Sequence, residues 1–112
     1  STRFAKSEQL DKSLDLLREL KNISSRGNLF YLLANRNIAR IEISLKNYDA
    51  ALKALNSIIL DQENSTILSL KGDALLGLGR TDHAITQYQK ALDISQVSEE
   101  RLIIEYKLSQ LN

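Results

Sequence analysis

The residues with the most reactive side chains in this sequence do not combine into a catalytic pattern. The chain has one histidine, His83, which stands beside Asp82, and it has no cysteine. Covalent catalysis needs a nucleophile, a base and an orienting group that converge on one point, and a lone histidine supplies only one of these. We therefore expect His83 to point to solvent early in a helix, and we expect no catalytic residue in this chain.

Two other patterns that can carry chemistry are better explained by helical structure. Glu99 and Glu100 are adjacent, so their carboxylates diverge on a helix and cannot form an acid–base pair. The glycines at 72, 77 and 79 have no preceding strand and no following Lys-Ser or Lys-Thr, both of which a phosphate-binding loop requires. Without cysteine, neither a disulfide framework nor a cysteine-based zinc cluster can form. The sequence predicts no cofactor and no metal site.

One stretch of the sequence is present twice, and it organises the chain. Residues 45–59 (LKNYDAALKALNSII) align with residues 78–92 (LGRTDHAITQYQKAL) at an offset of 33. In both copies small residues fall where two helices must approach closely, and bulky apolar residues follow at helical spacing. A fixed period of this length indicates an array of helix–turn–helix repeats. The structural positions of the two repeats are Ala39, Ala51 and Leu55 in the first, and Gly72, Ala84 and Tyr88 in the second.

The pattern divides one domain, 1–112, into a partial repeat at 1–27, repeats at 28–64 and 65–97, and a capping helix at 98–112. We expect helices at 10–23, 29–45, 48–60, 67–78, 81–94 and 98–112, joined by short turns. The helix at 10–23 corresponds to the second helix of a repeat at an offset of 38, so half a repeat precedes two whole ones. Residues 1–7 are expected to be the tail of an earlier helix, with Phe4 and Ala5 as its packing residues.

The helix ends carry recognisable capping residues. Asn64 or Ser65 is expected to cap the helix that follows it, and Thr81 the next one. Gly79 is expected as a left-handed C-cap. For the last helix we expect a Ser98 cap and an inner face that covers the open end of the array. The residues assigned to that face are Leu102, Ile103, Tyr106 and Leu111.

Composition narrows the classes of partner. A formal net charge of +1 over 112 residues does not favour nucleic acid, because proteins that bind nucleic acid carry a clear basic excess. No internal segment approaches the length of a membrane-spanning helix. Since the chain has no methionine, we expect it to be part of a longer protein, with any membrane anchor outside this segment.

The sequence favours a binding surface over a catalytic pocket. The first helix of each pair lines the groove that such arrays offer to partners. Arg36 and Arg40 lie four residues apart and share a helix face, which suits an acidic or extended segment. The alternative is an ordinary pair of solvated arginines, as most surface charges are. The residues assigned to the groove are Arg36, Asn37, Arg40 and Ile43 in the first repeat, and Ser69, Asp73 and Leu76 in the second.

The repeats resemble the tetratricopeptide repeat, both in GDALLGLGRTDHAITQYQKAL and in NIARIEISLKNYDAALKALNSI. That resemblance implies an all-α fold, a right-handed α-solenoid of antiparallel helix pairs with a C-terminal capping helix. The pattern departs from the family where Asn35 and Leu68 replace the opening tryptophan, and where Glu63 and Gln96 replace the closing proline. The charges do not match the lysine and asparagine clamp that some members use for a terminal carboxylate.

A second resemblance covers nearly the whole chain. The order of segments, the Lys71-Gly72-Asp73 opening of the last repeat and the final YKLSQL are similar to the YfgM-type ancillary subunits of the SecYEG translocon. This implies a non-catalytic protein-binding domain on the periplasmic face of the bacterial inner membrane, with translocon subunits and a periplasmic chaperone as partners. The alternative is a cytosolic repeat scaffold, or an accessory domain of a larger regulator or enzyme. The sequence gives no oligomeric state.

Overall fold

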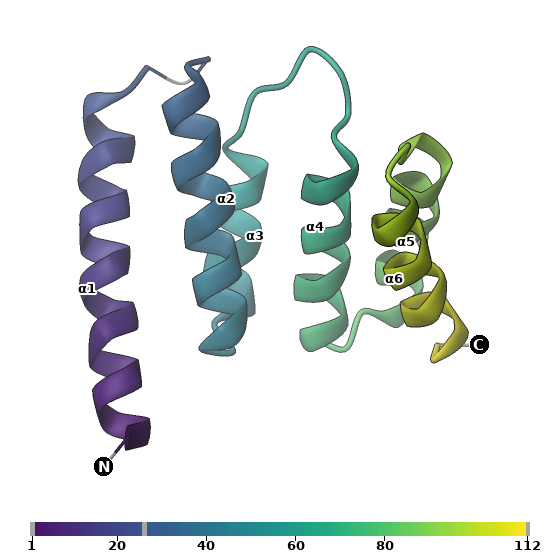
Figure 1. Ribbon diagram of the computed structural model, residues 1–112, viewed down its shortest axis with the longest axis horizontal. Helices are drawn as coiled ribbons and strands as arrows, with labels where there is room; N and C mark the ends of the chain where they lie inside the picture. Colours follow the sequence, from purple (N-terminus) through teal and green to yellow (C-terminus); the bar gives the residue numbers. More distant parts are fainter. Residues whose placement is uncertain (1, 26, 112) are drawn as a thin grey trace. The chain divides into compact units, whose positions relative to one another are not determined.

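The computed structural model describes residues 2–25 and 27–111, and their side chains from residue 6 onward. Over these ranges the chain forms six helices and no strand (Figure 1). It divides into two compact units, Ser1–Ile59 and Leu60–Asn112, each of which contains three of the helices. The all-α prediction is therefore confirmed. None of the described helices is both long enough and apolar enough to cross a membrane.

The first unit contains α1 (Thr2–Ile23), α2 (Leu29–Ser44) and α3 (Tyr48–Asn56), with α2 packed against both of the others. The expected break between 1–7 and 10–23 is wrong, because α1 is one continuous helix of 22 residues. No proline or glycine interrupts it, so nothing stops the helix between the two segments. The side chains of Phe4 and Ala5 lie outside the described residues.

The second unit contains α4 (Ser65–Gly77), α5 (Thr81–Ile94) and α6 (Ser98–Ser109). Helix α5 packs against both α4 and α6. Its core is a cluster of Leu68, Ala84, Tyr88, Ala91 and Ile104, which joins all three helices. A single apolar cluster thus holds the second helix pair and the last helix together.

The turn inside each helix pair has the same backbone geometry. Helix α2 ends before Lys46 and helix α4 before Gly79, and both residues are left-handed, with φ of 63° and 78°. In each turn two N–H groups reach back to the last carbonyls of the preceding helix, which is the Schellman arrangement. The hydrogen bonds are Lys46 to Ile43 at 3.0 Å, Asn47 to Glu42 at 2.8 Å, Gly79 to Leu76 at 3.0 Å and Arg80 to Leu75 at 2.9 Å. Gly79 therefore has the left-handed conformation expected of it.

The close approach of α4 and α5 depends on Gly72. A Cβ atom added there would lie 2.6 Å from Cε1 of Tyr88, whose ring is fully buried. Such a distance is too short for any real contact, so the absence of a side chain at 72 makes room for the aromatic ring. In the first unit the corresponding residues are Ala39 and Leu55, and both are buried.

Several expected helix ends differ from the structure. Helix α3 ends at Asn56 and does not reach residue 60, so Ile59 is exposed. The side chain of Ser57 explains the early end, since its hydroxyl donates to the carbonyl of Ala54 at 2.7 Å and to Oδ1 of Asn35 at 3.3 Å. Such side-chain bonds compete with continued helix. Thr81 and Ser98 are the first residues of α5 and α6 and do not act as their N-caps.

Asparagine side chains cap the starts of two helices. Asn64 caps α4 through a hydrogen bond to its Oδ1 from the N–H of Ile67 at 3.1 Å, as expected. Asn28 caps α2 in the same way, with Phe30 as the donor at 2.7 Å. Leu29 and Phe30 are exposed at the start of α2, whereas Tyr31, which follows them, is buried.

The inner face of the last segment differs from the prediction at every residue except Leu111. Ile104 is fully buried, whereas Leu102, Ile103 and Tyr106 are exposed. Leu108 and Leu111 pack against the core beside Ile104, which gives an inner face with the spacing i, i+4 and i+7. Three consecutive apolar residues, 102–104, fit several helix faces, so their pattern alone does not select the inner one.

Candidate protein-binding surface

A groove lies between α1 and α2 in the first unit. It has a volume of about 510 Å³, and Ser13, Leu16 and Leu17 of α1 form one wall. Asn37, Arg40 and Ile41 of α2 form the other. The lining is mainly apolar, and Leu16 leaves 67% of its surface exposed. Two residues predicted for a binding groove, Asn37 and Arg40, are therefore brought together with α1 residues that the sequence had not placed there.

The remaining predicted residues of α2 are less open. Arg40 is exposed, while Arg36, Asn37 and Ile43 are half-buried. The Nε of Arg36 is buried and has no hydrogen-bond partner among the described residues. Arg40 is consequently the cation of this pair that a partner can reach most directly.

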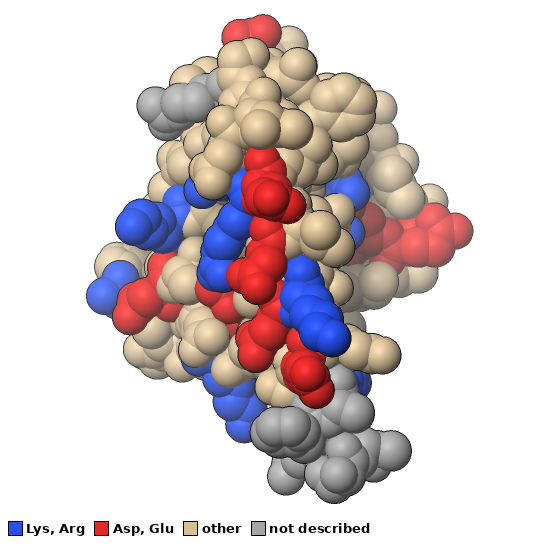
Figure 2. Space-filling model, turned by 90° about the vertical axis from the view of Figure 1, so that its left-hand side faces the viewer, with Lys and Arg blue, Asp and Glu red and all other residues tan. Residues whose placement is uncertain are grey.

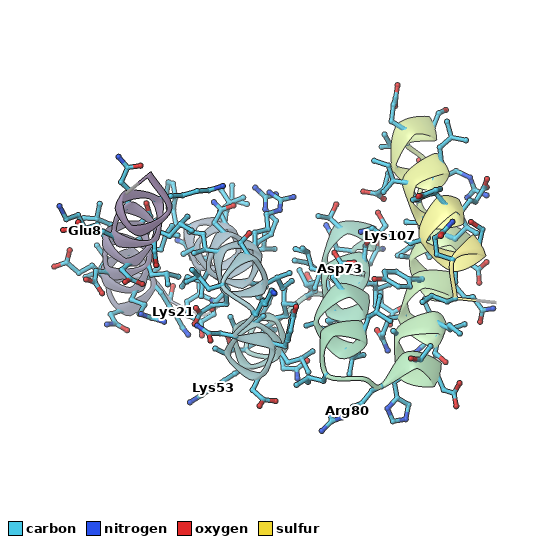
Figure 3. The ribbon with its side chains drawn as sticks, turned by 90° about the horizontal axis from the view of Figure 1, so that it is seen from below. Glu8, Lys21, Lys53, Asp73, Arg80 and Lys107 are labelled. Atoms are coloured by element: carbon cyan, nitrogen blue, oxygen red, sulfur yellow. The ribbon has the colours of Figure 1, made fainter. Side chains whose placement is uncertain are left out.

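Another recess of the first unit has a basic rim. It measures about 260 Å³ and is lined by Arg18, Lys21, Ile38, Glu42, Ala50, Lys53 and Ala54. The buried carboxylate of Glu42 accepts hydrogen bonds from Arg18 at 3.2 Å and from Asn47 at 3.3 Å. Lys21 lies 5.9 Å from the ring centroid of Tyr31, and Figure 3 shows Lys21 and Lys53 on one side of the unit. Arg18 thus neutralises Glu42 inside the recess.

The acidic residues of α1 lie on one side of the helix. Its acidic residues Glu8, Asp11, Asp15 and Glu19 are all exposed and recur at spacings of three and four, which places them along one side. Figure 2 shows Asp and Glu side chains gathered along this side of the first unit, with Lys and Arg side chains beside them. None of the described residues that line the α1–α2 groove is acidic. The α1 wall of the groove therefore consists of uncharged side chains, and the acidic residues of α1 lie on another side of the helix.

The predicted residues of the second unit lie on α4, and one of them is already engaged. Lys107 donates to both carboxylate oxygens of Asp73, at 2.9 Å and 3.2 Å, and the hydroxyl of Tyr88 donates to Oδ1 at 2.5 Å. Figure 3 shows Asp73 and Lys107 facing one another. Ser69 is half-buried and Leu76 is partly exposed. Asp73 therefore links α4 to α5 and α6 through these two contacts.

This cluster also changes the acidity of a tyrosine. Burial raises the pKa of Tyr88 far above its usual value, and the hydrogen bond to Asp73 and the charge of that carboxylate raise it further. Lys107 lies 5.6 Å from the ring centroid of Tyr88. Tyr88 is therefore a neutral donor at any physiological pH, and its role in the cluster is to hold Asp73.

The sequence did not indicate a second polar contact, at the start of α4. The carboxylate of Glu100 in α6 accepts hydrogen bonds from the hydroxyls of Ser65 and Thr66, the latter at 3.0 Å. Partial burial by itself raises the pKa of Glu100, but hydrogen bonds from Ser65, Ser95 and Thr66 outweigh it and lower the pKa. An acid near a helix N-terminus also interacts favourably with the helix dipole. This contact fastens α6 to α4.

The remaining candidate for chemistry lies at the start of α5. His83 is exposed, as expected, and shares a shallow recess of about 290 Å³ with residues 79–82. Among the described residues, no group of three histidine, cysteine, aspartate or glutamate side chains is placed to hold a metal ion.

Comparison with known proteins places these helices in a wider context. The family model described as "Tetratricopeptide repeat-like domain" matches residues 4–112. The chain is 28% identical over 109 residues to the protein named "Ancillary SecYEG translocon subunit" of Buchnera aphidicola subsp. Acyrthosiphon pisum. It is 27% identical over 112 residues to the protein of the same name from Escherichia coli K12.

These alignments include 97% and 98% of this chain but only 56% and 53% of the two relatives. The chain thus spans about half the length of the curated relatives it matches. No solved structure matches the chain with significance. The family and the named relatives together support a role in protein interaction.

Proposed function

Because the chain belongs to the tetratricopeptide repeat-like domain family over residues 4–112, we propose that it is a non-catalytic protein-binding domain of a subunit associated with the Sec translocon. The observation that carries this proposal is the similarity to two ancillary SecYEG translocon subunits along almost the entire chain. A likeness of fold alone does not assign a function, so the name shared by both relatives is the more specific support.

The finer parts of the proposal follow the same resemblance. We place the domain on the periplasmic face of the bacterial inner membrane, held there by an anchor outside this segment. Its partners are translocon subunits and a periplasmic chaperone, which it keeps close to emerging chains. The residues proposed to meet them are Arg36, Asn37, Arg40 and Ile43 of α2 in the first unit, and Ser69, Leu76 and the Lys107-paired Asp73 of α4 in the second unit.

In-cell crosslinking of the full-length gene product tests this proposal. The complexes are recovered from gently solubilised membranes and identified by mass spectrometry, with wild type beside Arg40→Glu. Since Arg40 is exposed, reversing its charge alters the surface and leaves the core intact. We expect translocon subunits and a periplasmic chaperone with wild type, and a clear loss of at least one of them with Arg40→Glu.

Lys90→Glu is the matched control, since Lys90 is an exposed cation on α5 in the second unit. This variant should recover the same partners as wild type. If wild type recovers only cytosolic proteins, the translocon assignment is wrong and the chain is a cytosolic scaffold or an accessory domain. If both variants recover wild-type partners, the contact lies away from Arg40.

A further inference from the structure

The basic recess of the first unit, lined by Arg18, Lys21, Ile38, Glu42, Ala50, Lys53 and Ala54, is enclosed by three helices. It measures about 260 Å³, and α1, α2 and α3 each contribute lining residues. Its apolar floor includes Ile38 of α2 and Ala54 of α3, both of which are buried. Pockets that enclose a drug-sized ligand measure roughly 300–1,000 Å³. The basic recess therefore suits a few side chains of a partner better than a whole small molecule.

The side of α1 that borders this recess is the side that packs against the rest of the unit. Leu14, Arg18 and Lys21 follow one another at spacings of four and three, so they share one face of the helix. Leu14 is buried and α1 packs against α2, so this face turns toward α2. Ser13 and Leu16 line the separate α1–α2 groove. The walls of the basic recess are thus all supplied by the three helices of the first unit.

The lining of the basic recess has an excess of positive charge. It includes Arg18, Lys21 and Lys53, whereas Glu42 is the one acidic residue among its described lining residues. The side chain of Glu42 is 5% exposed and pairs with Arg18 at 3.2 Å, so its charge is already balanced. Among the described residues, no carboxylate lies within salt-bridge distance of Lys21 or Lys53. Two cations, one from α1 and one from α3, are therefore available to an anionic partner.

The acidic residues next to the recess favour a narrow occupant. Asp15 and Glu19 are exposed on α1 beside Arg18, and Asp49 is exposed on α3 one turn before Lys53. A broad anionic surface, such as a membrane of acidic lipids, would meet these carboxylates together with the lysines, and like charges repel one another. A single peptide segment can reach the lysines without covering the acidic residues. The charge pattern therefore favours an acidic segment of a protein.

We propose that the basic recess binds an acidic segment of a partner protein, in which two carboxylates pair with Lys21 and Lys53. The methylene groups of the acidic side chains lie over Ile38 and Ala54, and glutamate covers more of this apolar floor than aspartate because it is one methylene longer. Lys21 lies 5.9 Å from the ring centroid of Tyr31, an attraction that holds its ammonium group in place. The proposal rests on the protein-binding function above and names the chemistry of the segment that is bound.

Short peptides test the proposal with the purified full chain. The probe carries two glutamates in a frame of serine and glycine, and the comparison peptide has glutamine in place of both, which removes the charge and keeps the shape. Amide chemical-shift mapping gives the affinity of each peptide and its position on the chain. Acetylation of lysine side chains, followed by mass spectrometry, identifies the ammonium groups that the bound peptide protects.

We expect the glutamate peptide to shift amides of α1, α2 and α3 around the recess and to slow the acetylation of Lys21 and Lys53. Added salt should weaken its binding. The double variant Lys21→Gln with Lys53→Gln should weaken it roughly tenfold, about 1.4 kcal/mol, and should bind both peptides equally. Lys12→Gln is the matched control, because Lys12 is an exposed cation on the same helix that pairs with Glu8 at 4.0 Å, and it should leave the affinity unchanged. Circular dichroism confirms that all variants keep their helix content.

Several results would overturn the proposal. Equal binding of both peptides to wild type would exclude charge as the basis of recognition, and shifts confined to α4–α6 would place the site elsewhere. Phosphatidylglycerol vesicles that bind through Lys21 and Lys53, when the glutamate peptide does not bind, would make a membrane the occupant. Slower acetylation of both lysines in the full-length gene product without peptide would make another segment of the same protein the occupant. If crosslinking in cells recovers no translocon partner while the glutamate peptide binds as expected, the translocon assignment alone is wrong.

Discussion

The two helix pairs, α2–α3 and α4–α5, have turns of the same backbone geometry but differ in the side chains packed where their helices cross. Lys46 and Gly79 are left-handed at the same position of the repeat, with the same two backbone hydrogen bonds around each. At the helix crossing, a smaller side chain on one helix accompanies a larger one on the other. The first pair has Ala39 with Leu55, and the second has Gly72 with Tyr88. The backbone geometry of the turn is thus common to both pairs, whereas the side chains at the helix crossing are particular to each.

The difference shows which part of the repeat tolerates change. The Schellman turn depends on backbone hydrogen bonds, so very different side chains can occupy it. The crossing depends on summed volume, so a change on one helix requires an opposite change on the other. In the second pair the aromatic residue at the crossing also forms a polar cluster, because the hydroxyl of Tyr88 donates to Asp73 and Lys107 of α6 pairs with the same carboxylate.

The largest effect is expected from Gly72→Ala. The new Cβ overlaps the buried Tyr88 ring, and overpacking of this kind costs about 1–3 kcal/mol of unfolding free energy. Urea denaturation followed by circular dichroism measures the loss. Gly72→Ala combined with Tyr88→Leu copies the first pair, and it should be more stable than the two separate losses added together. If the stability losses of the two single variants simply add in the double variant, the side-chain volumes at positions 72 and 88 do not compensate one another.

A smaller effect with opposite signs is expected at the turns. Gly79→Ala places a Cβ on a residue with φ of 78° and should cost about 1–2 kcal/mol, although space around it is open. Lys46→Gly removes the same strain from the first turn and should stabilise the chain by up to about 1 kcal/mol. Both shifts appear in the urea midpoint. Stabilisation by Gly79→Ala would contradict the shared left-handed geometry.

The second pair should also respond to alkali in a way that the first does not. Because the folded pKa of Tyr88 is raised, its contribution to stability is complete below the ordinary pKa of 10.0 and declines as pH rises above it. Thermal unfolding measured on either side of pH 10 should show this decline. Tyr88→Phe removes the ionisable group and should flatten that part of the profile, at the cost of the hydrogen bond to Asp73. An unchanged alkaline decline in this variant would assign it to other groups.

The smallest effect concerns the starts of α2 and α4. Both have an asparagine cap, but α4 also has the Glu100 carboxylate, whose folded pKa is lowered. Its contribution is present above the ordinary pKa of 4.5 and is lost as pH falls through the folded pKa. Hydrogen exchange in acid should therefore accelerate in the first turn of α4 more than in that of α2. Glu100→Gln should remove the difference, and a difference that persists would exclude Glu100 as its source.

Much of the fold could be predicted because it is encoded locally. The offset of 33 residues located both turns, and Asn64 and Gly79 have the cap and the left-handed conformation that their residue types favour. The end of α3 could not be predicted, because Ser57 bonds to Asn35 of another helix, and that contact exists only after folding. The inner face of α6 was missed for a similar reason, since only the core of the second unit selects Ile104 from its apolar neighbours.

The sequence assigned Asn37 and Arg40 of α2 to a binding groove, but the α1 wall of the α1–α2 groove, with Leu16 and Ser13, depends on which side of α1 packs against α2. For Asp73, the sequence suggested an open surface, whereas its partners Lys107 and Tyr88 come from positions 34 and 15 residues away. Such long-range pairs leave no periodic pattern in a single sequence.

The loop that follows α3 has a consequence for how this chain can change in length. Residues 61–64 are exposed, and the boundary between the two compact units falls just before them, between Ile59 and Leu60. Exposed loops between units tolerate insertion, and each repeat in such arrays contacts mainly its neighbours. A duplicated repeat inserted into this loop would keep its own turn and its own helix crossing intact. This loop is therefore the position at which gene duplication, or the insertion of designed repeats, would lengthen the array with least disturbance to the two units.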